Sequence, residues 1–486
     1  MSVQIFLHGS FFGIEEFLVS PAHPSETEGA GACGERLLTG RSRWIALLSE
    51  ALPRALLAEL GLARILLGSS GGGEFLVVLP QESREAAGAF LRGAAEGIAG
   101  LGGGSLRLVW ASTENLGDWS LVRKRLTEEF DRQRATPVAT LSTGILEPRP
   151  MAAPPDSGGY FSRTMAVGVR EAGCVGWSPE SPARVVPGEG KHTWPLGDTQ
   201  DSILTARHTA LRKNGTEPAG LAELARRADG RSGWGVLRGD VDNFGLRLRR
   251  LQNVEEHVQL STLYKQFFAG ELQVVCSMPE FWRKVSILHT SGDDFAVYGA
   301  WDALILLARE IQRLFHQFAE ANLKDLPGPE AKTISMALAL AETSHSPIAA
   351  VYREAGRRLE AAKSADKDCV HLFGRTIEWR QLARAAELKD TLVRMVREFG
   401  CAPQFLAELA RDYREKDTAD DVEGRLRGPW RYQRLLRPVN GAARDREFQK
   451  LRAGLIAELV GKNAAQSKLR PAGRAAVEWA RLCLER

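Results

Sequence analysis

Two short acidic motifs, about fifty residues apart, hold the residues best suited to chemistry. Residues 238–245 read RGDVDNFG and residues 290–295 read TSGDDF. Each motif follows an apolar run of the kind found in β-strands, at 233–237 and 285–289. Carboxylates at the ends of neighbouring strands could bind two divalent cations, the usual device for in-line attack of a hydroxyl on a nucleotide phosphate. The motifs therefore predict nucleotidyl transfer.

Within the motifs, Asp240 and Asp293 are the predicted metal ligands, with the main-chain carbonyl of Val241 as a third. Such oxygen ligands favour Mg²⁺ or Mn²⁺. Gly292 lets the turn take a backbone shape that other residues avoid, and small residues leave room for a nucleotide. Asp294 is the remaining predicted catalytic carboxylate. An exposed Gly-Asp-Asp turn without function is the alternative interpretation.

The end of a predicted helix, at 362–368, places Lys363 and Lys367 one turn apart. Lysine ammonium groups so placed can bind phosphates as point charges. A solvated helix end with local salt bridges to Asp366 and Asp368 is the alternative.

Apolar periodicity predicts an α+β protein with four parts. Residues 1–145 and 221–382 each show the order β–α–β–β–α–β, which is typical of ferredoxin-like palm domains. The hairpin around 70–75 in the first occupies the position of the acidic turn in the second, which indicates a weak internal duplication. Residues 146–220 are crowded with proline and glycine and are predicted to form an irregular linker domain. Residues 383–486 have helical periodicity and are predicted to form an all-α domain.

Composition excludes several classes of protein. The 486 residues are 44% hydrophobic, and no apolar run reaches the roughly 20 residues of a membrane span. The N-terminus lacks the features of a secretory signal. Six scattered cysteines without a C-x-x-C pair argue against a zinc site and against disulfides, so we expect a cytoplasmic protein without zinc.

The net charge of +4 is unevenly distributed, because basic residues are concentrated between 425 and 452. A basic helical segment suggests contact with a polyanion or an acidic protein surface. Arg431, Arg434 and Arg437 are the predicted contact residues for RNA or a partner. A solvated helix surface is the alternative.

Taken together, these motifs resemble the large subunit of type III CRISPR interference complexes, especially type III-A. Residues 221–245, 291–302 and 372–379 are similar to the family's entry into the second palm, its catalytic hairpin and its exit. In the first palm, residues 13–17, 38–42 and 70–72 resemble the family's glycine-rich, Arg-Ser and hairpin signatures.

The resemblance implies synthesis of cyclic oligoadenylate from ATP, switched on when guide RNA pairs with target RNA. It implies two ATP molecules between the palms, two Mg²⁺ or Mn²⁺ ions, and a complex with filament and small helical subunits, without membrane contact. It also makes Asp240 and Asp293 metal ligands and gives Asp294 the role of assisting the attacking hydroxyl. The nucleotide-binding residues that we predict are Ser291, Gly292, Asp242, Asn243, Phe244, Lys363 and Lys367, with Ser70, Gly71 and Gly72 from the first palm.

The sequence departs from the family pattern in several places. None of the nine histidines is followed by aspartate, so we expect no histidine–aspartate DNase domain and no DNA cutting. Ser10 stands where the first palm would need an aspartate, which suits a palm that binds but does not catalyse. Two rivals remain: a catalytically silent scaffold of the same complex, and a stand-alone signalling cyclase.

Overall fold

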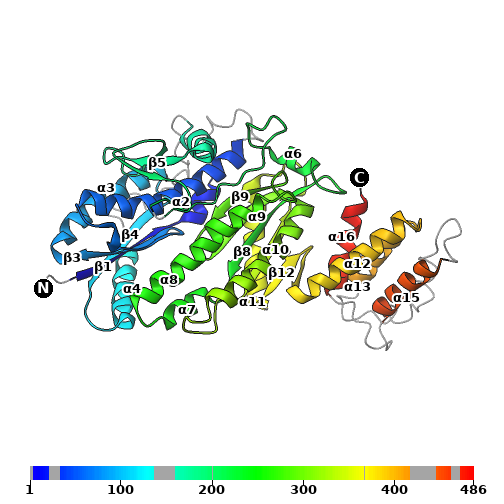
Figure 1. Cartoon of the computed structure of the whole chain (residues 1–486). Coiled ribbons are helices and arrows are strands. Elements are labelled where there is room, and N and C mark those ends of the chain that lie inside the picture. The colour runs from blue at the N-terminus through cyan, green and yellow to red at the C-terminus, as the bar shows by residue number, and fades with distance from the viewer. Residues whose placement is uncertain are drawn as a thin grey trace, which may run out of the picture.

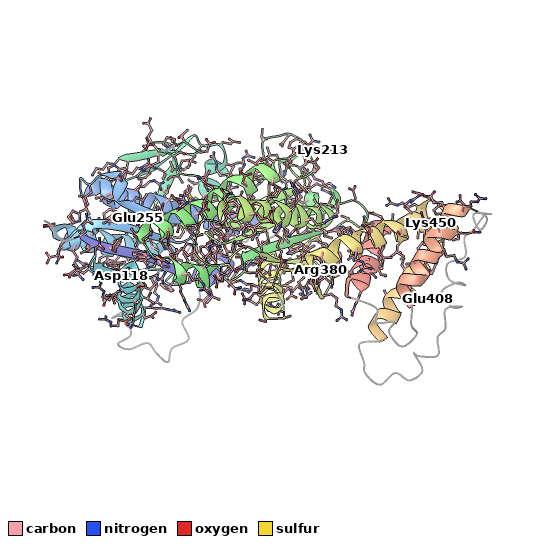
Figure 2. All side chains as sticks on the ribbon, turned by 60° about the horizontal axis from the view of Figure 1, so that its bottom comes forward. Asp118, Lys213, Glu255, Arg380, Glu408 and Lys450 are labelled. Atoms are coloured by element: carbon pink, nitrogen blue, oxygen red, sulfur yellow. The ribbon has the colours of Figure 1, made fainter. Side chains whose placement is uncertain are left out.

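The computed structural model describes residues 4–20, 33–135, 159–199, 201–365, 367–415, 445–460 and 471–485. It is an α+β protein in which two sheet-and-helix units lie side by side and C-terminal helices extend beyond the second unit (Figure 1). Figure 2 shows the same separation, with Glu408 and Lys450 on the C-terminal helices and Asp118 and Glu255 on the other side of the molecule. No described helix has both the length and the apolar character needed to span a membrane.

The first palm, residues 4–135, has the predicted β–α–β–β–α–β order, with the short helix α1 inserted after β1. Its sheet has the strand order β2-β3-β1-β4. The bounds are β1 (Gln4–Phe12), α1 (Ile14–Val19), α2 (Cys33–Glu59), the 3₁₀ turn η2 (Arg64–Leu66), β2 (Leu67–Gly71), β3 (Glu74–Pro80), the 3₁₀ turn η3 (Gln81–Ser83), α3 (Arg84–Leu101), β4 (Arg107–Glu114) and α4 (Trp119–Ala135).

The second palm, residues 234–378, repeats this topology. Its sheet has the order β13-β12-β11-β8-β10-β9, so the four strands equivalent to those of the first palm lie in the same order and two more extend the β11 edge. The bounds are β8 (Trp234–Val241), α7 (Phe244–Arg250), α8 (Val254–Lys265), the π-helix η5 (Gln266–Glu271), α9 (Leu272–Cys276), β9 (Val285–Thr290), β10 (Asp294–Ala300), α10 (Trp301–Asn322), β11 (Ile334–Leu340), α11 (Ile348–Ala365), β12 (Cys369–Leu372) and β13 (Arg375–Glu378). The internal duplication is therefore a repeat of topology.

The segment between the palms is more regular than the sequence suggested. It contains a three-stranded sheet of order β6-β5-β7, a π-helix and two short helices. The bounds are η4 (Tyr160–Gly168), α5 (Val169–Glu171), β5 (Cys174–Trp177), β6 (Val185–Pro187), β7 (His192–Pro195) and α6 (Leu221–Arg226). Its order comes from packing on α2, since Tyr160, Phe161 and Trp177 are buried in the same core as Trp44. The described part of the predicted irregular linker domain therefore contains short regular elements, and the domain boundaries stay a prediction.

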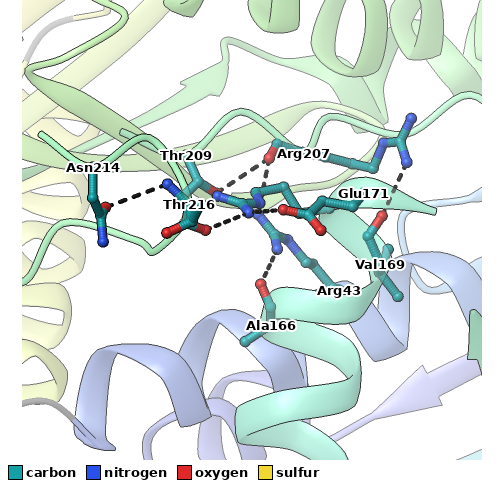
Figure 3. Close-up of polar contacts among 9 residues, drawn as sticks. Arg43, Ala166, Val169, Glu171, Arg207, Thr209, Asn214 and Thr216 are labelled. Atoms are coloured by element: carbon teal, nitrogen blue, oxygen red, sulfur yellow. Dashed lines mark hydrogen bonds and ion pairs between the residues drawn. The ribbon is translucent and has the colours of Figure 1, made fainter. Parts of the chain in front are cut away.

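Two arginines, the buried Arg43 and the half-buried Arg207, connect this segment to α2 and within itself (Figure 3). Arg43 of α2 donates to the carbonyls of Ala166 and Arg207, the latter at 2.9 Å, and to the Thr209 hydroxyl at 2.7 Å. Arg207 in turn donates to the Val169 carbonyl at 2.9 Å. Because unpaired main-chain carbonyls are costly to bury, these bonds hold the segment in one position against the first palm.

The C-terminal part is helical, as predicted, in the residues that the structure describes. Its helices are α12 (Trp379–Arg397), α13 (Gln404–Glu415), α15 (Arg446–Val460) and α16 (Pro471–Leu484). One side of α16 packs on the core of the second palm through Trp479 and Leu482. Val477 and Ala480 of the same helix pack in a separate core with α12 and α13. Helix α16 therefore joins the helical part to the second palm.

Candidate active site

The two palms pair their strands in the same register at the residues predicted to do chemistry. In the second palm Asp294 on β10 lies opposite Asp240 on β8. In the first palm Glu74 on β3 lies opposite Ser10 on β1. The two palms thus have equivalent positions, but only the second has an acid at both of them.

The main-chain bond beside each hairpin turn repeats as well. The Val241 N–H donates to the Asp293 carbonyl at 2.9 Å, and the Phe11 N–H donates to the Gly73 carbonyl at 2.8 Å. Gly73 is therefore the first palm's equivalent of Asp293. With serine for Asp240 and glycine for Asp293, the first palm lacks two of the three carboxylates of the second, and its lack of catalysis stays a prediction.

The two hairpin turns touch each other. The Ser291 hydroxyl lies 3.3 Å from the Gly72 carbonyl oxygen, and a Cβ atom added to Gly72 would lie 2.6 Å from the Gly292 nitrogen. Packing around this point is reciprocal, because α2 of the first palm contacts β9 and α8 of the second contacts β2. The palms therefore meet hairpin to hairpin, with the acidic turn at the contact.

Three carboxylates surround this turn and influence one another. Burial, together with the charges of Asp294 and Asp240, raises the pKa of Asp293 to about 8. Burial also raises the pKa of Asp240 to about 6, although the nearby Lys363 ammonium acts in the opposite direction. Mutually repelling acids with raised pKa values are typical of functional sites and of sites that a cation neutralises.

Asp294 differs from its two neighbours. Its pKa is lowered in spite of burial, because the charges of His289 and Arg238 favour the ionised form. The Asp294 Oδ1 atom lies 3.0 Å from His289 Nε2. The site therefore combines an ionised carboxylate with two acids that hold their protons more tightly than usual.

The two predicted lysines lie at the site. The Lys363 ammonium contacts Asp240 Oδ1 at 2.5 Å, and the Lys367 ammonium donates to the Asn243 side-chain oxygen. Asn243 has a left-handed backbone with φ of 61° and precedes α7. Helix α11, which carries Lys363, and the segment just after it, which carries Lys367, thus bring both ammonium groups to the end of β8, where phosphates would approach the carboxylates.

Asp242 does not face a cavity, which contradicts its predicted contact with nucleotide. Its side chain is only 1% exposed and accepts hydrogen bonds from Thr333 and Ser335 hydroxyls, both at 2.8 Å, and from the Asp368 N–H at 3.0 Å. Strand β8 ends at Val241, so the chain turns and the alternation that would have aligned Asp242 with Asp240 stops. Asp242 fixes the end of the strand instead.

Two cavities flank the acidic turn. The first cavity, of about 470 Å³, lies between the palms and is lined by Ser70, Gly71, Gly72, Phe244, Gly292 and Asp293, among others. The second cavity, of about 480 Å³, is lined by Asp240, Asp294, Arg238, Arg353, Arg357 and Glu15. Asp293 therefore faces one cavity, while Asp240 and Asp294 face the other. Both cavities have walls from both palms.

Several charged residues at these cavities were not predicted. In the first cavity, Glu50 of α2 is buried with Lys265 of α8, and Lys265 with Arg54 holds the pKa of Glu50 at about 2 in spite of burial. Ser70 donates to Glu50 at 2.9 Å. Glu50, Arg54 and Lys265 lie in helices, where apolar spacing reports packing and not a site. The available signal was an acidic residue, Glu50, among the apolar residues of α2.

The chemistry of the predicted carboxylates suits a divalent cation, and their role as metal ligands stays a prediction. Among the residues that the structure describes, no group of three or more His, Cys, Asp or Glu side chains is arranged to hold a metal. The predicted set needs only two carboxylates and the Val241 carbonyl, which supply hard oxygen donors. The raised pKa values of Asp240 and Asp293 and the ammonium beside Asp240 indicate where positive charge is favourable. Arg431, Arg434 and Arg437 lie outside the described residues.

Comparison with known proteins agrees with this geometry. Residues 234–371 match the family model described as Cas10/Cmr2, second palm domain. The chain is 29% identical over 184 residues to a CRISPR system single-strand-specific deoxyribonuclease Cas10/Csm1 of subtype III-A from Mycobacterium tuberculosis. It is 31% identical over 116 residues to the protein of the same description from Methanocaldococcus jannaschii.

The chain is a homologue of Cas10/Csm1. The matched regions cover 33% and 21% of this chain but only 22% and 14% of those two relatives. The resemblance to the type III-A large subunit is thereby confirmed, and it is carried by the Cas10 second palm.

Solved Csm1 structures share the fold over the whole chain. The Csm1-Csm4 cassette in complex with one ATP superimposes with a TM-score of 0.74 at 17% identity, covering 100% of this chain and 70% of that one. The cassette in complex with cA4 gives a TM-score of 0.72 at 16% identity, covering 99% and 70%. The Cas10 fold therefore extends beyond the second palm to the first palm and the helical part.

Proposed function

We propose that this Cas10/Csm1 homologue converts ATP into cyclic oligoadenylate, with Asp240, Asp293 and Asp294 as its catalytic carboxylates. The observation that carries the proposal is the meeting of three carboxylates at one hairpin tip between two cavities, each lined by both palms. Related Csm1-Csm4 cassettes have been solved with ATP and with cA4. We further propose that the activity is switched on in the cytoplasm when a guide RNA, held with filament and small helical subunits, pairs with target RNA.

The residues have distinct roles in this proposal. Asp240, Asp293 and the Val241 carbonyl would hold two Mg²⁺ or Mn²⁺ ions. When bound, such ions lower the pKa of the attacking hydroxyl and offset the negative charge of the phosphates. Asp294, whose pKa is lowered, is ionised and can assist the attacking hydroxyl. The Lys363 ammonium, 2.5 Å from Asp240, is within reach of phosphates bound at that carboxylate.

The neighbouring small residues make room for the substrates. Gly71, Gly72 and Ser70 line the first cavity with Ser291, Gly292 and Phe244, so a nucleotide there contacts both hairpins. Asn243 and Lys367, which bond to each other, stand beside the lysine that contacts Asp240.

The test is synthesis by the assembled complex. We expect complex containing this chain, incubated with ATP, Mn²⁺ and RNA complementary to the guide, to release cyclic oligoadenylate. The double substitution Asp293→Ala, Asp294→Ala should abolish product while leaving assembly intact. Equal absence of product from the wild type and the variant refutes the enzyme proposal.

A silent scaffold is the main alternative, and metal binding separates the two. A scaffold does not need to bind Mn²⁺ at Asp240 and Asp293, whereas the cyclase does. We expect Mn²⁺ binding in the wild type and weaker binding after Asp240→Asn. A stand-alone cyclase differs in that it would make product without guide RNA or partner subunits.

The basic C-terminal segment is proposed to contact RNA or a partner subunit. Replacing Arg431, Arg434 and Arg437 with glutamate should weaken co-purification with the complex, and more so at higher salt. Unchanged co-purification across salt concentrations refutes that role.

A further inference from the structure

The carboxylate of Asp294 is connected to the first palm through a histidine. His289 at the end of β9 places Nε2 at 3.0 Å from Asp294 Oδ1 and Nδ1 at 3.3 Å from the hydroxyl oxygen of Ser42. Ser42 belongs to α2, so the contact crosses from the second palm to the first. The His289 side chain is only 11% exposed, and both ring nitrogens face protein groups.

The hydrogen-bond chemistry assigns a direction to this chain of contacts. The Asp294 carboxylate oxygen, 3.0 Å from Nε2, accepts the hydrogen bond that Nε2 donates. The Ser42 hydroxyl can donate to Nδ1 of a neutral ring or accept from Nδ1 of a charged one, so it contacts the ring in either form. Ser42 therefore holds the ring in the orientation that presents Nε2 to Asp294.

Local strand geometry aims the histidine at the carboxylate. His289 lies opposite Ala296 on β10, two residues beyond Asp294, and the register shifts immediately afterwards. Diagonal neighbours of this kind are within reach of long side chains, and bulges often redirect a side chain at functional sites.

The first palm provides an internal comparison. Its hairpin has the same register shift, but Ser69 occupies the position equivalent to His289, opposite Leu76. The acid of that palm, Glu74, contacts Ser10 at 3.3 Å and His8 at 3.6 Å, both on β1. In the second palm the histidine beside the acid therefore belongs to the hairpin itself, whereas in the first palm it comes from β1.

We propose that His289 is a positioning residue that orients Asp294 and that Ser42 acts through it, so that the catalytic carboxylate is held correctly only when the first palm is docked. This inference rests on the proposed cyclase function. A second contact reinforces the dependence on the first palm, because Arg238 beside Asp294 pairs with Glu15 of α1 at 2.9 Å.

Substitutions of His289 and Ser42 in the assembled complex test the proposal. We expect His289→Phe to lower kcat for ATP by roughly 10–100-fold with little change in KM, as for groups that orient a catalytic ligand. His289→Gln, whose amide can donate to Asp294, should recover most of that loss. A glutamine variant as slow as the phenylalanine variant refutes positioning by a hydrogen bond.

A double-mutant cycle tests whether Ser42 acts through His289. Ser42→Ala should lower kcat in the wild type but have no further effect in His289→Phe, because residues in one network are not additive. Ser49→Ala is the matched control: Ser49 is a buried serine of the same helix that bonds only within α2 as described, to the Ala46 carbonyl. An equal loss from Ser42→Ala in both backgrounds overturns the Ser42 step.

A measurement without turnover separates failure of this inference from failure of the cyclase proposal. Nitrogen chemical shifts of selectively labelled histidine in the full chain at pH 8.5 report which ring nitrogen carries a proton. We expect a proton on His289 Nε2, and a displaced Nδ1 resonance in Ser42→Ala. A ring without a proton on Nε2 overturns the inference, whatever the activity of the complex.

Discussion

Alanine at Gly72 would place a methyl group between the two hairpin turns. Its Cβ atom would lie 2.6 Å from the Gly292 nitrogen and 2.9 Å from the Ser291 hydroxyl oxygen, whereas ordinary contacts begin near 3.4 Å. The palms must therefore separate by about 0.8 Å at the acidic turn. A displacement of about 1 Å can lower turnover on the order of 100-fold. We expect a loss of that size in cyclic oligoadenylate synthesis by Gly72→Ala.

Backbone strain alone would also destabilise this variant, and the chain offers a control for it. Gly61, just after α2, has the same φ of +66° as Gly72, but nothing lies within 4 Å of an added Cβ. Alanine at either position should cost roughly 1–2 kcal/mol of folding stability from its left-handed backbone. Only the Gly72 variant carries the clash between palms.

The assay compares product formation and urea unfolding of the two variants. We expect Gly61→Ala to synthesise product within about twofold of the wild type, because a stability loss of this size leaves the protein folded. Equal activity of Gly72→Ala and Gly61→Ala would show that the contact between turns does not control catalysis. Equally severe loss in both would show that the effect is general instability.

Three further predictions concern carboxyl groups. The pKa of Asp293 is about 8 without metal, so Mn²⁺ must displace a proton when it binds. The Mn²⁺ affinity measured by calorimetry should therefore rise from pH 6 to 8.5. This rise should be smaller in Asp293→Asn. Asp242→Asn should lower the free energy of unfolding by about 2–3 kcal/mol in urea titrations, since three donors lose a charged acceptor. Burial raises the pKa of Glu35 to about 7, so the folded state binds its proton more tightly than the unfolded state. Stability should therefore fall as pH rises from 4.5 through 7, by about 1–3 kcal/mol relative to Glu35→Gln, in thermal unfolding at pH 5 and pH 8.

The sequence predicted the strands and hairpins well because their signals are local. Apolar runs followed by glycine-rich or acidic turns indicated both hairpins, and the matching order of elements indicated the duplication. The apolar spacing typical of a helix begins at Ser42, but α2 begins at Cys33. Glycines at 34 and 40 argue against a helix there, yet Gly40 is needed because an added Cβ would lie 1.8 Å from the Phe161 carbonyl oxygen. Packing between distant segments overrode propensity.

The site was predicted where residues lie close in sequence and missed where folding brings them together. Asp293 and Asp294 are adjacent, and Lys363 and Lys367 lie at and just beyond the end of α11, so motif and spacing sufficed. The contacts of Ser42 with His289 and of Glu50 with Lys265 join the two palms over more than two hundred residues. No periodicity within one helix or strand can indicate such a pair.

The duplication also explains why the two hairpins differ in charge. The first palm has one acid, Glu74, at the position of Asp294, with Ser10 and Gly73 at the positions of Asp240 and Asp293. Burial and then the charges of Asp294, Asp240 and Glu74 already raise the pKa of Asp293 to about 8. Carboxylates in place of Ser10 and Gly73 would add like charges near a contact as close as that of Gly72 and Gly292 and weaken the docking of the palms. On the proposed function, metal binding and activation of the attacking hydroxyl are therefore confined to the second palm.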